Sequence, residues 1–227
     1  CFQQYAPVSV TGIVMDPKSG DVWALAERPV FDPNKYGDYP KETWRLRAVT
    51  DTFEPGSMFK PFVFAAALQE GAVHLDDVFF CGDGSYQIGA RTLHDAHPYG
   101  KLTALEGVVK SSNICMAQIG QRLGAPKAHA YLTAFGFGRP TGVGLTGEAG
   151  GYVVPARSWS KYTITSVPMG HEVSVTALQI ATSFCAVVNG GFLIKPRVLR
   201  GVMSSDGQVL ERHTEPEVLS RVLADSV

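Results

Sequence analysis

The chain has 227 residues, of which 45% are hydrophobic and 18% are charged, and its formal net charge at pH 7 is −1. A chain of this length and composition has enough apolar material for one sizeable core. The near-neutral charge gives no basic stripe, so we expect no nucleic-acid partner. No run of residues has the length and apolar character of a membrane span or of a signal peptide.

Two alternating segments near the N-terminus predict a pair of antiparallel strands. Residues 8–15 and 21–26 alternate between apolar and polar side chains, and the segment Asp-Pro-Lys-Ser-Gly-Asp at 16–21 separates them. Such a segment between two alternating runs is typical of a hairpin turn. We therefore interpret Lys18-Ser19-Gly20 as turn residues.

A helix is predicted over 57–69, where an Ala- and Leu-rich run follows Glu54-Pro55-Gly56. Ser57 and Lys60 are three positions apart, so their side chains share one face of this helix. A serine becomes a good nucleophile when a base takes its proton, and a desolvated lysine is neutral enough to do so. The alternative is a helix cap followed by a surface lysine, because Ser-x-x-Lys alone is a weak motif.

A second polar turn, Ser111-Ser112-Asn113, lies within a run of helical patterns, which we predict over 104–110, 112–123 and 127–135. If this turn faces the first helix, Ser111 can relay a proton and Asn113 can form a hydrogen bond with a substrate amide. The turn can also be a helix cap, and capping by one residue leaves the other two free.

The second half of the chain predicts further helices and strands around a glycine-rich loop at 135–151. These glycines lack the Gly-Lys-Ser/Thr ending of a phosphate-binding loop, so we reject a nucleotide site. The later predicted elements are a helix over 175–188, short strands over 192–194, 198–203 and 208–210, and a final helix over 217–224. The fold class indicated is α/β, in one domain over 1–227.

The cysteines form no Cys-x-x-Cys pair. Cys115 and Cys185 lie in apolar helical patterns, which predicts that they are core residues. A second group contains the thiolate, imidazole and carboxylate ligands of a possible zinc site: Cys81, His94, Asp95 and His97. Its spacing matches no metal signature, and a polar loop beside a cleft is the alternative. We therefore predict no metal and no cofactor.

In chain order, these segments resemble the transpeptidase domain of class B penicillin-binding proteins. The resemblance covers a hairpin at 11–26, the segment Phe31-Asp32-Pro33-Asn34, the approach to the serine at 47–57, and a glycine-containing turn with its helix at 168–179. Ser-x-x-Lys is a motif of this superfamily. The resemblance implies the penicilloyl-serine transferase fold, an antiparallel sheet with a helical subdomain and an active site at their junction.

The resemblance implies a peptidoglycan D,D-transpeptidase that cross-links stem peptides through a serine acyl-enzyme. Ser57 would be the nucleophile, Lys60 its base and Ser111 a proton relay, while Asn113 would bind the donor peptide. The implied partners are stem peptides with a D-Ala-D-Ala donor and an amine acceptor, β-lactam antibiotics, and cell-wall synthesis proteins of the division or elongation machinery. The implied location is the bacterial cell membrane, with the catalytic domain on the periplasmic side.

The family's third motif, Lys-Ser/Thr-Gly on a strand beside the nucleophile, is expected after the helix at 175–188 and is not found there. We therefore expect that the chain lacks this C-terminal strand and the family's N-terminal membrane anchor. An isolated copy would then have an open sheet edge beside Ser57 and would acylate slowly. The alternatives are a serine β-lactamase or D,D-carboxypeptidase, a β-lactam sensor domain and, from another class, a non-catalytic cell-wall scaffold.

The turn Gly170-His171-Glu172 carries two charged or titratable side chains. We expect both to be solvated loop residues, as isolated charged side chains usually are. The alternative is that they help to receive an amine acceptor.

Overall fold

The structure is a computed structural model and describes residues 2–227. Its α-helices are α1 Phe2–Tyr5, α2 Arg47–Thr50, α3 Lys60–Gln69, α4 Ala104–Val109, α5 Asn113–Leu123, α6 Ala125–Ala134, α7 Thr163–Ser166 and α8 Ala177–Val188. Its 3-10 turns are η1 Pro33–Asp38, η2 Lys41–Thr43, η3 Gly56–Phe59, η4 Ala156–Ser158 and η5 Val167–Met169.

The strands are short and pair antiparallel in every sheet of the described chain. They are β1 Val10–Met15, β2 Val22–Arg28, β3 Thr52–Phe53, β4 Val78–Gly82, β5 Ser85–Ile88, β6 Arg91–His94, β7 Gly100–Thr103, β8 Tyr152–Val153, β9 Val173–Thr176, β10 Phe192–Ile194, β11 Gly201–Met203, β12 Val209–Arg212 and β13 Val218–Arg221. The pairs are β1–β2, β4–β7, β5–β6, β10–β13 and β11–β12, and β9 joins β3 to β8.

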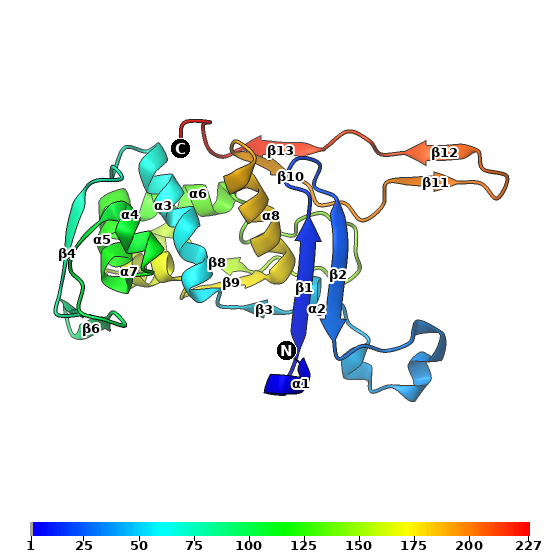
Figure 1. The fold of residues 1–227 in the computed structure, drawn as a ribbon, viewed down its shortest axis with the longest axis horizontal. Helices are drawn as coiled ribbons and strands as arrows, with labels where there is room; N and C mark the ends of the chain where they lie inside the picture. The colour runs from blue at the N-terminus through cyan, green and yellow to red at the C-terminus, as the bar shows by residue number, and fades with distance from the viewer. Residues whose placement is uncertain (1) are drawn as a thin grey trace.

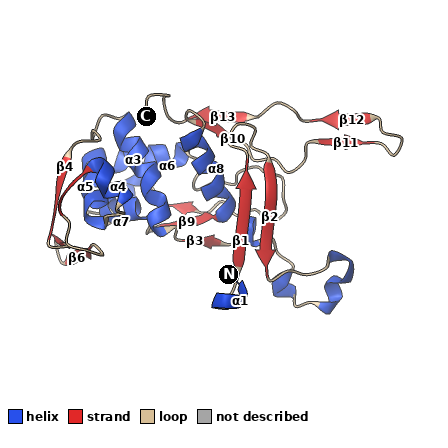
Figure 2. Cartoon of the chain, viewed as in Figure 1, coloured by secondary structure: helices blue, strands red, loops and turns tan. Residues whose placement is uncertain are grey.

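Helices α3 to α7 gather on one side of the molecule, and the β1–β2 hairpin lies beside α8 (Figure 1). Two segments project from this body: the β11–β12 hairpin and the loop with η1 and η2 that follows β2 (Figure 2). No helix of residues 2–227 is long and apolar enough to cross a membrane.

A cluster of aromatic rings fixes α3 inside the helical group. The ring of Phe62 is fully buried, and its centroid lies 4.8 to 5.8 Å from those of Phe59, Phe135, Phe137 and Phe184. Burial of each phenylalanine contributes about 1.5–3 kcal/mol, and aromatic pairs at these distances add to it. The start of the helix, which carries Lys60 and directly follows the Ser57 turn, is therefore held firmly.

Most of the predicted elements are present, with small shifts of their ends. The N-terminal hairpin is confirmed, because β1 and β2 pair and the Asp16 carboxylate accepts a hydrogen bond from the Lys18 N–H at 2.8 Å. The predicted helix over 57–69 begins as the 3-10 turn η3 and continues as α3. The loop at 135–151 is confirmed, since no helix or strand begins between α6 and β8 in the described chain.

The final helix predicted over 217–224 is wrong. Residues Val218–Arg221 form β13, which pairs with β10 through Phe192 with Arg221 and Leu193 with Ser220. A short apolar run does not distinguish a helix from a strand by itself. Here the run forms a strand because it pairs with the edge of β10. The strands β4 to β7, which lie between α3 and α4, were not predicted from the sequence.

Candidate active site

Ser57 lies on η3, between the short strand β3 and helix α3, and its side chain is exposed. The turn before it packs backbone against backbone on a second turn. The Gly56 N–H donates to the Gly170 carbonyl at 3.2 Å, and a Cβ built on Gly170 would lie 2.1 Å from the Gly56 carbonyl oxygen. Only glycine fits at 170, because any side chain would push the Ser57 turn away.

Lys60 is buried, with 1% of its surface exposed, and its ammonium faces the second polar turn. Nζ donates to the Ser111 carbonyl at 2.5 Å, to Ser111 Oγ at 2.9 Å and to Asn113 Oδ1 at 2.9 Å. Burial lowers the pKa of Lys60 to about 8, and the charges of Asp95 and Cys115 only partly oppose this shift. A substantial fraction of Lys60 is therefore neutral at slightly alkaline pH.

Ser111 has a strained backbone that points its carbonyl toward Lys60. Its φ is +56°, in the left-handed region that residues other than glycine seldom adopt. Strain of this kind is often found at functional sites, where the surrounding structure maintains it. Because both the carbonyl and the hydroxyl of Ser111 contact Lys60, this residue is placed to carry a proton to or from the amine.

The side-chain amide of Asn113 is fixed from both sides. Its Oδ1 accepts from Lys60, and its Nδ2 donates to the His94 carbonyl at 2.9 Å. One N–H and one oxygen lone pair of the amide remain for a ligand. The structure thus brings together Lys60, Ser111 and Asn113, with Ser57 one helical turn before Lys60. In residues 2–227 no hydrogen bond joins the Ser57 hydroxyl to Lys60, and such contacts often tighten only when substrate binds.

Asp95 caps helix α5, a role that the sequence did not reveal. Its carboxylate accepts from Ser112 Oγ at 2.6 Å and from the backbone N–H groups of Asn113 at 2.5 Å and Ile114 at 3.1 Å. A carboxylate at the N-terminus of a helix is stabilising because it satisfies free N–H groups there. Asp95 therefore sets the position of the turn that contacts Lys60.

The side chains named as possible zinc ligands do not converge on one point in the structure. Among the residues that the structure describes, no three His, Cys, Asp or Glu side chains are placed to hold a metal ion. Asp95 is occupied by the helix cap, while Cys81 is buried with its Sγ 3.7 Å from Ser112 Oγ. Burial raises the pKa of the Cys81 thiol, which disfavours the thiolate that a metal would need.

The turn at 170–172 is tied to the residues that precede the nucleophile. His171 Nδ1 lies 3.0 Å from Glu54 Oε2, and the Glu172 N–H donates to Glu54 Oε1 at 2.9 Å. These two hydrogen bonds lower the pKa of the Glu54 carboxyl. His171 and Glu172 are exposed, as expected, but Glu54 links them to the Ser57 turn.

The single Lys-Ser-Gly string lies elsewhere. Ser19 lines a cavity of about 550 Å³ that also borders Lys195, Arg197 and His213, and Ser57 and Lys60 are not part of it. The interpretation of Lys18-Ser19-Gly20 as a turn is confirmed, because the N–H groups of Lys18 and Gly20 donate to the carboxylate and the carbonyl of Asp16 at 2.8 and 2.9 Å. The cavity mixes cations with the carboxylates of Glu215 and Glu217 and shows no preference for one charge.

The site has the parts that serine acyl transfer needs. They are an exposed serine, a buried lysine with a lowered pKa, a second hydroxyl and a fixed amide. Residues 10–224 match the family described as penicillin binding protein transpeptidase domain. The chain belongs to this family, which confirms the resemblance and the expected fold class.

Individual relatives give the same result. The chain is 35% identical over 224 residues to the penicillin-binding protein PbpB of Mycobacterium tuberculosis, covering 96% of this chain and 33% of that protein. It is 31% identical over 216 residues to the probable peptidoglycan D,D-transpeptidase PbpC of Pseudomonas aeruginosa, covering 95% of this chain and 38% of that protein. The chain thus spans about a third of the length of these two relatives.

A solved structure shares the fold. Penicillin-binding protein 3 of Mycobacterium tuberculosis, in complex with aztreonam, superposes with a TM-score of 0.86 at 32% identity. The match covers 99% of this chain and 50% of that one. The mixture of antiparallel strands and clustered helices seen here is therefore the penicilloyl-serine transferase arrangement.

Proposed function

We propose that this domain is a peptidoglycan D,D-transpeptidase that cross-links stem peptides through an acyl-enzyme on Ser57. The observation that carries the proposal is the buried Lys60 amine, held against Ser111 and Asn113 with a pKa of about 8. A lysine with an ordinary pKa would be almost fully protonated at neutral pH and would be a poor base.

In the first half-reaction, Ser57 Oγ attacks the carbonyl of the D-Ala-D-Ala bond as its proton passes to the neutral amine of Lys60. The tetrahedral intermediate then expels the terminal D-Ala, whose amine receives a proton by way of Ser111. Asn113 holds the donor peptide through the free part of its amide. The backbone N–H of Ser57 supplies one hydrogen bond to the developing oxyanion.

In the second half-reaction, the amine of another stem peptide attacks the ester carbonyl on Ser57. The bond from the carbonyl carbon to Ser57 Oγ breaks, and the proton lost by the amine returns to the serine through Lys60. The products are a new peptide bond and free enzyme, so the reaction needs no cofactor.

The relatives support the wider setting of this proposal. One is named a probable peptidoglycan D,D-transpeptidase, and solved structures of another hold aztreonam or ampicillin. We therefore extend the proposal to β-lactams as acylating ligands of Ser57. The proposal also places the domain on the outer side of a bacterial cytoplasmic membrane, working with cell-wall synthesis proteins of the division or elongation machinery.

Covalent labelling tests the proposal. The intact protein should form an adduct with a labelled penicillin, and Ser57→Ala should remove it, as measured by intact-mass spectrometry. Ser85→Ala, which changes an exposed serine of β5, is the matched control and should keep the adduct. Retention of the label in Ser57→Ala would contradict the assignment of the nucleophile.

A further inference from the structure

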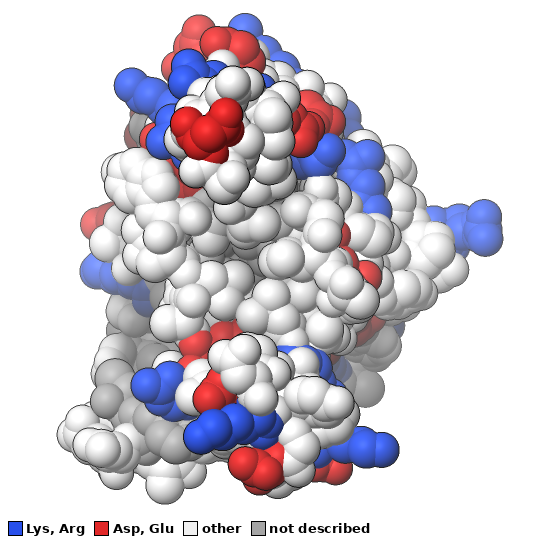
Figure 3. Space-filling view, turned by 90° about the vertical axis from the view of Figure 1, so that its right-hand side faces the viewer, with Lys and Arg blue, Asp and Glu red and all other residues white. Residues whose placement is uncertain are grey.

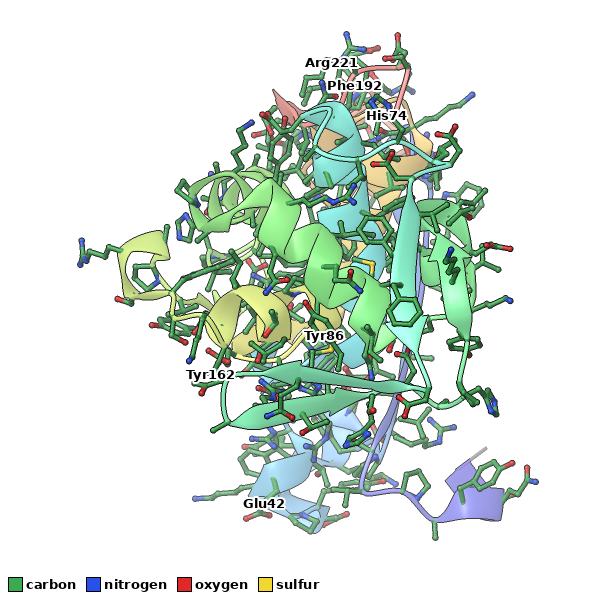
Figure 4. The ribbon with its side chains drawn as sticks, turned by 90° about the vertical axis from the view of Figure 1, so that its left-hand side faces the viewer. Glu42, His74, Tyr86, Tyr162, Phe192 and Arg221 are labelled. Carbon is green, nitrogen blue, oxygen red and sulfur yellow. The ribbon has the colours of Figure 1, made fainter. Side chains whose placement is uncertain are left out.

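Arg91 presents a guanidinium toward the body of the molecule from the β5–β6 hairpin. It is the first residue of β6, and its side chain lies on the same face of the strand as that of Leu93, which is buried. Its Nη1 donates to Ser166 Oγ at 2.5 Å. Figure 4 shows this hairpin crossing close to α5 and α7, with Tyr86 and Tyr162 at the contact.

Arg91 differs from the other half-buried arginines in having no acidic partner. Three arginines of residues 2–227 are half-buried, and two of them, Arg47 and Arg197, form ion pairs with Asp51 and Asp21. In the same residues, no carboxylate oxygen lies within 4.0 Å of the Arg91 guanidinium. A guanidinium offers five N–H donors in a fork that matches a carboxylate, and only one has a partner here.

The guanidinium lies between the two turns that border the nucleophile. Strand β6 ends at His94, whose carbonyl accepts from Asn113. On the other side, the Ser166 carbonyl accepts from the His171 N–H at 3.2 Å, directly after Gly170, which contacts the Ser57 turn. These hydrogen bonds connect Arg91, through His94 and Ser166, to both turns, and we call this side of the candidate active site its wall.

A second cation adds to this charge at the tip of the same hairpin. Lys161 Nζ lies 2.6 Å from the position that a Cβ on Gly89 would occupy, two residues before Arg91. Within the described part of the chain, Lys161 also has no carboxylate within 4.0 Å. Together the two cations favour an anionic ligand at this end of the wall.

We infer that Arg91 recognises a carboxylate of the donor stem peptide, on the residue immediately before D-Ala-D-Ala. This inference rests on the proposed function, in which Asn113 binds the donor next to the scissile bond. Arg91 is three residues from His94, or roughly 10 Å along an extended strand. An extended donor peptide held by Asn113 rises about 3.3 Å per residue, so a long side chain on its preceding residue can reach over this distance. The site would then prefer a diamino acid with a distal carboxylate over lysine at that position.

Peptide binding tests the inference without turnover. Two pentapeptides that end in D-Ala-D-Ala and differ only at the third residue, a diamino acid with a distal carboxylate or lysine, are titrated calorimetrically into the intact Ser57→Ala protein. The carboxylate peptide should bind about tenfold or more tightly, as a charge-assisted hydrogen bond predicts. Arg91→Gln in this background should remove the preference by weakening only the carboxylate peptide.

Ser166→Ala is the matched control, because it deletes the hydroxyl contact of Arg91 but keeps the cation. It should retain the preference, while Lys161→Gln should reduce it only partly. Equal weakening of both peptides by Arg91→Gln would show that Arg91 only holds the hairpin in place, and would overturn the inference. Equal binding of the two peptides by the Ser57→Ala protein that keeps Arg91 would also overturn the inference. Penicillin labelling of the parent protein separately reports whether the proposed function holds.

Discussion

Helix α3 and the β11–β12 hairpin differ most in what surrounds them. Seven of the ten residues of α3 are buried, Lys60 among them, whereas every residue of β11 and β12 is exposed. The hairpin projects away from the body and, with strands of three and four residues, has little to stabilise it on its own. The predicted base Lys60 is thus carried by a largely buried helix that directly follows the Ser57 turn, and the hairpin takes no part in the geometry of the site.

The distribution of charge follows the same division. In the view of Figure 3, charged side chains gather at the top and the bottom of the face, where the projecting segments lie, and the middle is largely uncharged. Exposed charges keep their ordinary hydration. Lys60 loses that hydration on α3, and this loss is what lowers its pKa. Enclosure of α3 is therefore a chemical requirement of the site as well as a source of stability.

Removal of the Lys60 amine from α3 should have the largest effect on the rate of acylation. Lys60→Ala should slow acylation by penicillin by about a hundredfold to ten-thousandfold, since general-base help is typically worth this much. Stopped-flow measurement of the acylation rate checks the expectation. Lys127→Ala, on the exposed side of α6, is the control and should leave the rate unchanged. A Lys60→Ala rate within about threefold of the parent rate would rule out a role as base.

The sequence predicted the parts of the site that depend on local patterns. Ser57 and Lys60 share a helical turn, and Ser111 and Asn113 flank the start of α5, so spacing alone suggested each pair. The resemblance to a family then indicated that the pairs meet, and the contacts of Lys60 show that they do.

The features that were missed depend on contacts between distant segments. Asp95 caps α5 across 17 residues from Ser112, and no local pattern marks such a contact. Residues Val218–Arg221 form the strand β13 because they pair with the edge of β10. The strands β4 to β7 are too short to show a clear alternation of apolar and polar residues. The unpaired state of Arg91 likewise emerges only when every neighbouring carboxylate is located.

A pair of substitutions can test the comparison through stability. Phe62→Ala removes a fully buried ring from the cluster around α3 and should lower the free energy of unfolding by about 3–5 kcal/mol. Leu210→Ala on β12, where 66% of the side chain is exposed, should change it by no more than about 0.5 kcal/mol. Urea denaturation of both variants measures the difference. A similar decrease in the free energy of unfolding in both variants would mean that the hairpin contributes to the core.

The pH dependence of acylation gives a smaller but more specific test. Burial places the pKa of Lys60 at about 8, below its ordinary value of 10.5, so the neutral base accumulates as the pH rises through 8. At pH 7 about a tenth of the amine is neutral, and the acylation rate should therefore be about tenfold below its alkaline plateau. The rate should be half-maximal near pH 8 and should fall steadily as the pH is lowered.

The same shift also fixes the sign of the effect on stability. Between about 8 and 10.5 the unfolded chain binds the lysine proton while the folded chain does not, so this residue makes unfolding less favourable as the pH rises. Leu210→Ala should leave the midpoint of the rate profile unchanged, because β12 does not contribute to the desolvation of Lys60. A variant that admits water beside α3, such as Phe62→Ala, should move the midpoint upward toward the ordinary lysine value. An unmoved midpoint in a folded Phe62→Ala protein would show that enclosure by the aromatic cluster does not control the base.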